Sequence, residues 1–228
     1  GTADRLTDIL EDLREKLIRL RKMVLVRNRL YLNSTADEEG LGRLAETTGT
    51  LLEALPAGHP PAKRPEQAHR AGHIGIAVPA QVCYVTKVLA APPYDDPLAA
   101  GLFVLARQLS NGYLYRHIRV QGGAYGGSCR YEPLGGLFAF LSYRDPHLTE
   151  TLAVYQDAVD SALQNPIAQE ELEKAVIGSI GALDRPLDPA GRGYTALIRE
   201  FSGLNDSDRL RFRNEVLNVT PQRLQATA

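Results

Sequence analysis

The sequence predicts an α+β fold, in which a mixed and largely antiparallel sheet carries helices packed on one face. Three observations lead to this prediction. Helical and strand patterns follow one another without the strict alternation of parallel α/β folds. The composition is that of a globular protein, with 44% hydrophobic and 23% charged residues. A chain of 228 residues is also long enough to bury about 70% of its unfolded surface.

The first part of the chain, residues 1–55, has the pattern of a helix-strand-helix segment. Apolar residues recur every three or four positions between Asp4 and Lys22, which is the spacing of one helical stripe. The expected elements are, in order, a helix over 4–22, strands at 24–26 and 30–32, and a helix over about 41–55 capped by Ser34 or Thr35. We expect this segment to end a preceding domain or to begin the last one.

The amino-acid composition changes after residue 55, because residues 56–71 contain four prolines and few apolar side chains. This composition predicts a linker. The linker leads into a C-terminal α+β domain, which we expect to cover residues 72–228.

Within that domain, turn and capping residues set the expected boundaries. Asn111-Gly112 has the composition of a helix C-terminus, and Asp145 before Pro146 that of an N-terminus. The expected elements are strands at 74–78 and 82–85, a helix over about 97–109, strands at 128–132 and 137–143, helices over about 146–163, 170–183, 190–202 and 207–217, and a last turn from Thr220.

Charge and composition exclude several classes of function. The net charge is −1, so no overall field attracts nucleic acid or an anionic membrane, and no apolar run is long enough to span a bilayer. We therefore expect neither nucleic acid nor membrane as a partner. Cys83 and Cys129 are expected to be reduced thiols of an intracellular protein rather than a disulfide scaffold. Because the sequence has no initiator methionine, we expect it to be an excised piece of a longer chain.

The sequence predicts no metal site in this segment. His69 and His73 are four residues apart, as zinc ligands are in H-x-x-E-H, but Gly72 stands where that motif has its glutamate. The pair also lies between a proline-rich connection and a strand pattern, not on an expected helix. We therefore interpret these histidines as solvated side chains. Phosphate-binding and serine-nucleophile motifs are absent as well.

A glycine cluster, Gly122–Gly127, is the unusual feature of the chain. It keeps one large side chain, Tyr125, and Arg119 precedes it. The bare backbone at Gly122, Gly123 and Ala124 would let a second chain approach and pair with it. The alternative is a glycine bulge with a core tyrosine and a surface arginine, which the chemistry of these residues alone favours.

The motifs around this cluster resemble the pitrilysin/insulinase-like zinc metallopeptidases, and most of all their presequence-protease (peptidasome) subfamily. The similarity is carried by the run Ile118-Arg119-Val120-Gln121-Gly122-Gly123-Ala124-Tyr125-Gly126-Gly127 and by Leu141-Ser142-Tyr143-Arg144-Asp145-Pro146. Weaker matches are Val82-Cys83-Tyr84-Val85, Glu171-Leu172-Glu173-Lys174-Ala175 and Leu183-Asp184-Arg185-Pro186. These motifs occur in the same order as in the family, so the resemblance covers nearly the whole chain.

This resemblance implies the last portion of a chain with four related domains, arranged in two halves that close around unfolded peptides. Zinc would be bound by the N-terminal half of the same polypeptide, so that this segment holds no cofactor. Arg119 and Tyr125 match a catalytic arginine and tyrosine of the family, and we expect Gly122, Gly123 and Ala124 to contact substrate. The motif Ser142–Pro146 is expected to be structural, with an ion pair of Arg144.

The resemblance therefore implies part of a zinc metalloendopeptidase that is inactive as an isolated fragment. In the intact enzyme, Tyr125 would stabilise the oxyanion and closure of the halves would complete the site. The alternative is a stand-alone, catalytically inactive subunit with a structural or peptide-binding role. An excess of arginine over lysine, 21 to 5, indicates a bacterial cytoplasm. The family's organellar members make an organelle matrix the alternative location.

Overall fold

The computed structural model describes residues 2–58 and 72–228. The chain divides into two compact units. Unit 1 comprises Gly1–Ile74 with Leu187–Leu197, and unit 2 comprises Gly75–Pro186 with Ile198–Ala228. The expected domain limits at residues 55 and 72 stay a prediction. So does the linker over 56–71, most of which, together with His69, lies outside the described residues.

Unit 2 is built on a three-stranded antiparallel sheet. Its strands are β1 (Thr86–Ala90), β2 (Gly126–Glu132) and β3 (Leu137–Tyr143), in the spatial order β1-β3-β2. β2 and β3 form a hairpin, and β3 is the central strand. In the register, Phe140 of β3 is opposite Cys129 of β2 on one edge and opposite Lys87 of β1 on the other. The two strands expected around 128–143 are confirmed, and every described pairing is antiparallel.

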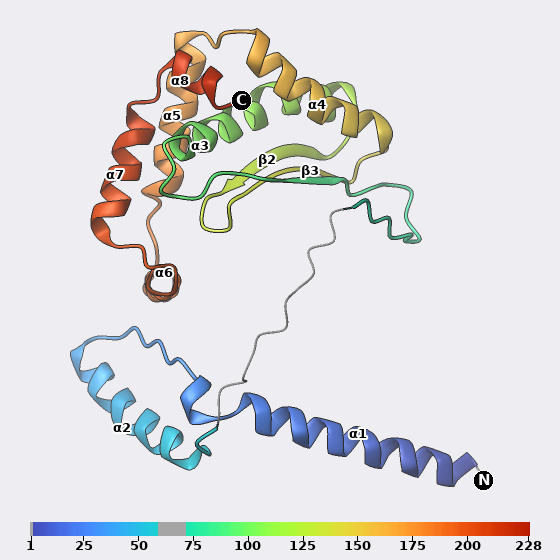
Figure 1. The fold of residues 1–228 in the computed structure, drawn as a ribbon, viewed down its shortest axis with the longest axis vertical. Helices are drawn as coiled ribbons and strands as arrows, with labels where there is room; N and C mark the ends of the chain where they lie inside the picture. Colours follow the sequence, from blue (N-terminus) through green and yellow to red (C-terminus); the bar gives the residue numbers. More distant parts are fainter. Residues whose placement is uncertain (1, 59–71) are drawn as a thin grey trace. The chain divides into compact units, whose positions relative to one another are not determined.

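Helices cover one face of this sheet, as Figure 1 shows. α3 (Ala99–Leu109) and α4 (Thr149–Gln164) lie over the sheet, whereas α5 (Gln169–Leu183), α7 (Asp206–Leu217) and α8 (Pro221–Ala226) pack against α3. Alternate residues of the strands face the helices, so that Phe140 stacks on Tyr155 of α4 at 5.2 Å between ring centroids. The Tyr155 hydroxyl donates to the Val85 carbonyl at 3.0 Å. The predicted α+β fold with helices on one face is confirmed.

The expected helix end at Asn111-Gly112 is wrong. α3 passes directly into η2 (Ser110–Gln121), a segment with wide π-helical turns, so the helical run extends to Gln121. Glycine inside a helix costs only about 1 kcal/mol relative to alanine. Burial of Leu114 and Ile118, both almost inaccessible to solvent, contributes about 1.5–3 kcal/mol each. Packing therefore outweighs the glycine signal.

Two strand predictions near the start of unit 2 also need correction. Residues 74–78 form no strand, and Ile74 and Ile76 are exposed. Over 82–85 the chain forms only an isolated bridge between Cys83 and Asp145, and β1 begins later, at Thr86. Alternating apolar residues predict a strand only where a neighbouring strand is present to pair with them.

Unit 1 contains α1 (Thr2–Val24) and α2 (Glu38–Ala54), which confirm the two expected helices. The strands expected at 24–26 and 30–32 are wrong, because the chain there forms a short 3₁₀ turn, η1 (Arg27–Arg29), with extended flanks. The expected cap at Ser34 or Thr35 is wrong as well. The Asp37 carboxylate accepts the Gly40 N–H at 2.8 Å and begins α2.

The remaining helices follow their capping signals. α6 (Pro189–Ser202) begins at a proline, as helices tolerate in the first turn. Asn205 and Asp208 form a capping box at α7, and Thr220 caps α8. None of the described helices is long and apolar enough to cross a lipid bilayer.

Candidate functional site

Arg119 lies in the last turn of η2, on the solvent side of a helix anchored by buried residues. Leu114 and Ile118 fix the inner face of this helix. Tyr115 lies four residues before Arg119, so the two side chains share the outer face. The Arg119 guanidinium carbon is 5.7 Å from the centroid of the Tyr115 ring, a distance typical of a cation–π contact.

The glycine cluster turns the chain sharply from η2 into β2. Gly123 has a φ of +74°, which side chains other than glycine rarely adopt. The N–H groups of Gly122, Gly123 and Ala124 donate back to the carbonyls at the end of η2, at 3.0, 3.2 and 3.1 Å. A methyl group at Gly127 would lie 2.7 Å from Ile118. The glycines therefore allow β2 to pass close to η2.

This turn places Tyr125 on the surface, beside Arg119. Tyr125 is 66% exposed, and its ring centroid is 5.7 Å from the guanidinium carbon of Arg119. The guanidinium thus contacts two tyrosine rings, and no carboxylate of the described chain pairs with it. Its N–H groups and the Tyr125 hydroxyl are hydrogen-bond donors on one exposed surface.

The residues that follow β3 contact the backbone of Tyr125 and so help to fix its position. The Tyr125 N–H donates to the Arg144 carbonyl at 3.4 Å, and Arg144 has a φ of +49°. The buried Asp145 carboxylate accepts the His147 N–H at 2.9 Å and the Thr151 hydroxyl at 2.7 Å. Asp145 therefore stabilises the loop. Its expected role as a helix N-cap is wrong, because α4 begins later, at Thr149.

The structure brings together Arg119 and Tyr125, the two predicted catalytic residues. The three predicted substrate contacts differ from one another in exposure. Gly123 is exposed, Gly122 is half-buried, and Ala124 is 4% exposed. Their N–H groups are already used within the turn, which leaves contact with substrate at these three residues a prediction. The expected ion pair of Arg144 is not formed with any described residue.

Comparison with known proteins places this chain in a family. Residues 75–226 match the family model described as the PreP C-terminal domain. The chain is 33% identical over 220 residues to presequence protease 1, chloroplastic/mitochondrial, of Arabidopsis thaliana. The match covers 92% of this chain and 20% of that protein. This chain belongs to the presequence protease family.

Other members of the presequence protease family show the same partial coverage. The chain is 28% identical over 214 residues to the mitochondrial presequence protease of Saccharomyces cerevisiae, covering 90% of this chain and 21% of that protein. It thus spans about a fifth of the length of these relatives. Its residues 75–226 are the part that matches the C-terminal domain of this family.

Solved structures of low sequence identity share the fold. The peptidase M16 inactive domain from Pseudomonas fluorescens aligns with a TM-score of 0.58 at 22% identity, over 82% of this chain and 47% of that one. A protease from Helicobacter pylori aligns with a TM-score of 0.59 at 15% identity, over 82% of this chain and 48% of that one. At these identities the likeness extends to the fold alone.

The described residues of this presequence protease domain do not fit a zinc site. No three His, Cys, Asp or Glu side chains within 2–58 and 72–228 lie close enough together to hold a metal ion. Burial raises the pKa of the Cys129 thiol to about 12, and its sulfur donates to the Ala106 carbonyl. A thiol held protonated in this way is a poor metal ligand.

Sequence analysis missed three tyrosines beside the candidate site. Tyr143 lies in a motif that was interpreted as structural, yet its ring contacts Tyr125 edge-on at 5.8 Å. Tyr84 in turn contacts Tyr143 at 5.3 Å. Tyr115 contacts Arg119 as described above. The spacing of Tyr115 and Arg119 would have predicted their contact, had residues 110–121 been recognised as helical.

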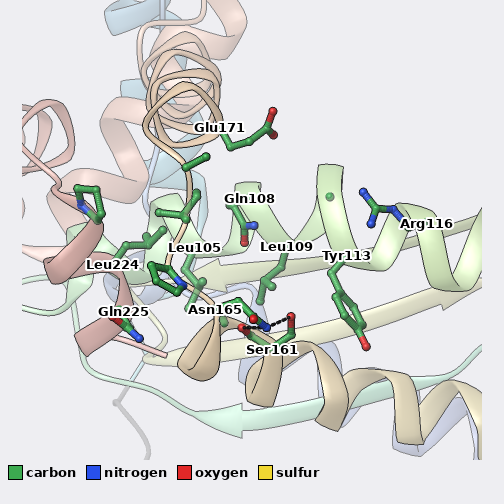
Figure 2. Close-up of a pocket in the computed structure, with 16 residues that line it drawn as sticks. Leu105, Gln108, Leu109, Tyr113, Arg116, Ser161, Asn165, Glu171, Leu224 and Gln225 are labelled. Atoms are coloured by element: carbon green, nitrogen blue, oxygen red, sulfur yellow. Dashed lines mark hydrogen bonds between the residues drawn. The ribbon is translucent and has the colours of Figure 1, made fainter.

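A separate hollow of about 280 Å³ lies on the helical side of unit 2, shown in Figure 2. Its walls combine apolar and polar side chains from α3, η2, α4, α5 and α8. The Asn165 amide, at its floor, donates to the carbonyl and hydroxyl oxygens of Ser161, and the Gln225 amide donates to the Leu163 carbonyl. Neither Arg119 nor Tyr125 lines this hollow, so it is distinct from the candidate site.

Proposed function

We propose that this domain supplies Arg119 and Tyr125 to a peptide-cleaving site that another part of a longer polypeptide completes. The single observation that carries the proposal is the exposed guanidinium of Arg119, which lies 5.7 Å from the ring centroids of both Tyr115 and the exposed Tyr125. Family membership supports it, because the named relatives are proteases about five times as long as this chain.

The chemistry of these two groups suits an extended peptide. A guanidinium and a phenol donate hydrogen bonds and accept few, so both match the carbonyl oxygens of a peptide backbone. We propose that Arg119 holds a carbonyl of the bound peptide. Tyr125 would donate to the oxyanion that develops at the carbonyl under attack, where the hydrogen bond is stronger than in the ground state.

Zinc, which the named family implies, would be bound by the N-terminal half of the same polypeptide. That half and unfolded peptides are the proposed partners. When bound, the metal would supply Lewis-acid chemistry, whereas the role of this domain is to bind and orient. Because the donors and the metal would lie on different parts of the chain, this domain alone is expected to cleave nothing. The bacterial cytoplasm stays a prediction, since the named relatives are chloroplastic or mitochondrial.

The test compares single variants of the polypeptide that contains both parts. Tyr125→Phe should lower kcat about 10²–10³-fold with little change in thermal stability. Arg119→Ala should lower kcat/KM about ten- to a hundredfold, the effect of losing a hydrogen bond to a charged group. Hydrolysis of an unstructured peptide is measured by the appearance of new N-termini.

Two matched controls lie on the same chain. Tyr194→Phe removes a hydroxyl from a tyrosine that is also 66% exposed, and Arg116→Ala removes an exposed guanidinium one turn before Arg119. Both should leave kcat/KM within twofold. Wild-type turnover by Tyr125→Phe and Arg119→Ala would reject the proposal. Peptide binding without any hydrolysis by the intact gene product would favour the inactive peptide-binding subunit.

A further inference from the structure

We propose that the face of the sheet opposite the helices is a subsite for an apolar side chain of the bound peptide. The face is formed by Tyr84, Val88, Leu141 and Tyr143, which we call the tyrosine face. This inference rests on the proposed function, because it names the part of the substrate recognised beside Arg119 and Tyr125.

The strand register gathers these four residues on one surface. Leu141 and Tyr143 are alternate residues of β3, so both point away from the helices, while the adjacent Phe140 and Ser142 are buried. Thr86 is opposite Leu141 and Val88 is opposite Ala139, which places the outward side chains of β1 beside those of β3. Tyr84 completes the group through its edge contact with Tyr143.

The tyrosine face is continuous with the candidate site. Ring contacts run from Tyr84 to Tyr143 at 5.3 Å and from Tyr143 to Tyr125 at 5.8 Å, and Tyr125 contacts Arg119. A peptide whose carbonyl oxygens meet Arg119 and Tyr125 would therefore extend a neighbouring side chain over Tyr143 and Leu141. Aromatic rings and branched aliphatic groups left in water favour an apolar occupant.

Charge points to the same occupant. The outward positions of the three strands carry two charged side chains, Arg130 and Glu132, which are 4.0 Å apart and pair with Ala139 and Leu137, whereas the residues of β2 opposite Leu141 and Tyr143 are Ser128 and Gly126. A lysine or arginine of the substrate would find no carboxylate at the strand positions opposite Leu141 and Tyr143, and it would face Arg119. An apolar side chain would neither leave a charge unpaired nor be repelled by Arg119.

Two substitutions on one strand provide the test. Leu141→Thr makes the tyrosine face polar, and Leu137→Thr makes the same change on the same side of β3, four residues away or about 13 Å. Leu141 is 36% exposed and Leu137 42%, so both substitutions should be tolerated in the sheet. Each is made in the polypeptide that contains the complete site. The substrates are unstructured peptides identical except for one scanned position that carries Leu, Ser or Lys.

The measured quantity is the ratio of kcat/KM for the Leu peptide to that for the Ser peptide at the position of strongest discrimination. Leu141→Thr should lower this ratio about five- to tenfold, and Leu137→Thr should leave it unchanged. The wild-type enzyme should cleave the Lys peptide more slowly than either. Far-UV circular dichroism confirms that both variants are folded.

Three results would overturn the inference. The first is an unchanged ratio in Leu141→Thr, the second is an equal decrease in both variants, and the third is loss of soluble protein in both. The last would mean that another part of the polypeptide covers this face. Tyr125→Phe serves as a separate arm. If it lowers kcat while Leu141→Thr leaves the ratio unchanged, the subsite is wrong and the proposed function stands. If Tyr125→Phe has no effect, the proposed function itself fails.

Discussion

At the scale of single residues, Gly127 shows how the site is held in place. A Cβ at this position would lie 2.7 Å from the Cβ and Cγ2 atoms of Ile118, which is itself almost fully buried. Gly127→Ala should therefore destabilise the fold by about 1–3 kcal/mol, the usual effect of overpacking a core. The midpoint of urea denaturation measures the change.

The neighbouring glycine is a matched control. A Cβ at Gly126 meets nothing within 4 Å, so Gly126→Ala should be neutral or slightly stabilising, by less than about 1 kcal/mol. Equal effects of the two substitutions would contradict the close packing of β2 on η2. That packing determines where Tyr125 lies.

At the scale of elements, Gly112 distinguishes a helix end from a continuous helix. The structure places Gly112 inside the helical run, where an added Cβ would lie 3.7 Å from the Gln108 side-chain nitrogen without a clash. Gly112→Ala should therefore stabilise the protein by about 0.5–1 kcal/mol. Thermal denaturation followed by circular dichroism measures the shift. A loss of stability of similar size would indicate the helix C-terminus expected from the sequence.

The contact between the end of α5 and α7 should depend on pH. Arg213 donates three hydrogen bonds of 2.7–3.0 Å to the Asp184 carboxylate and lowers the pKa of that group. A lowered carboxyl pKa stabilises the fold above the ordinary value of about 3.9, and the contribution is lost as pH falls through the lowered pKa. Asp184→Asn should thus be less stable than the wild type at pH 7, with the difference vanishing near pH 2.

Arg213→Ala is the background for the control. Without the guanidinium, Asp184→Asn should change the stability equally at both pH values, measured by chemical denaturation. If the pH-dependent difference persists in that background, Arg213 is not its cause.

Elements with strong local signals could be predicted from the sequence, and those that depend on distant partners could not. β2, β3, α5 and α7 follow from periodicity and capping residues, and the structure has them within a few positions. The strand expected at 74–78 fails because pairing decides strand formation. The helix end at Gly112 fails because burial of Leu114 and Ile118, invisible in local composition, outweighs one glycine.

At the scale of the whole molecule, the candidate site joins segments that are distant in sequence. Arg119 and Tyr125 were predicted because they belong to one motif. Tyr84 and Tyr143 were not, because their contact depends on the bridge between Cys83 and Asp145 at the end of the sheet. Family membership fits the proposal that this domain, which has no metal cluster among its described residues, supplies hydrogen-bond donors to a site that another part of a longer chain completes.

The central claim is that Tyr125 lies against the bound peptide, and photo-crosslinking tests it most directly. Position 125 of the complete polypeptide is replaced by p-benzoylphenylalanine, and position 177, exposed on the helical side in α5, serves as the control. After irradiation with an unstructured peptide, the account predicts a peptide adduct at position 125 and none at position 177. Adducts at both positions in equal yield, or none at position 125, would contradict it.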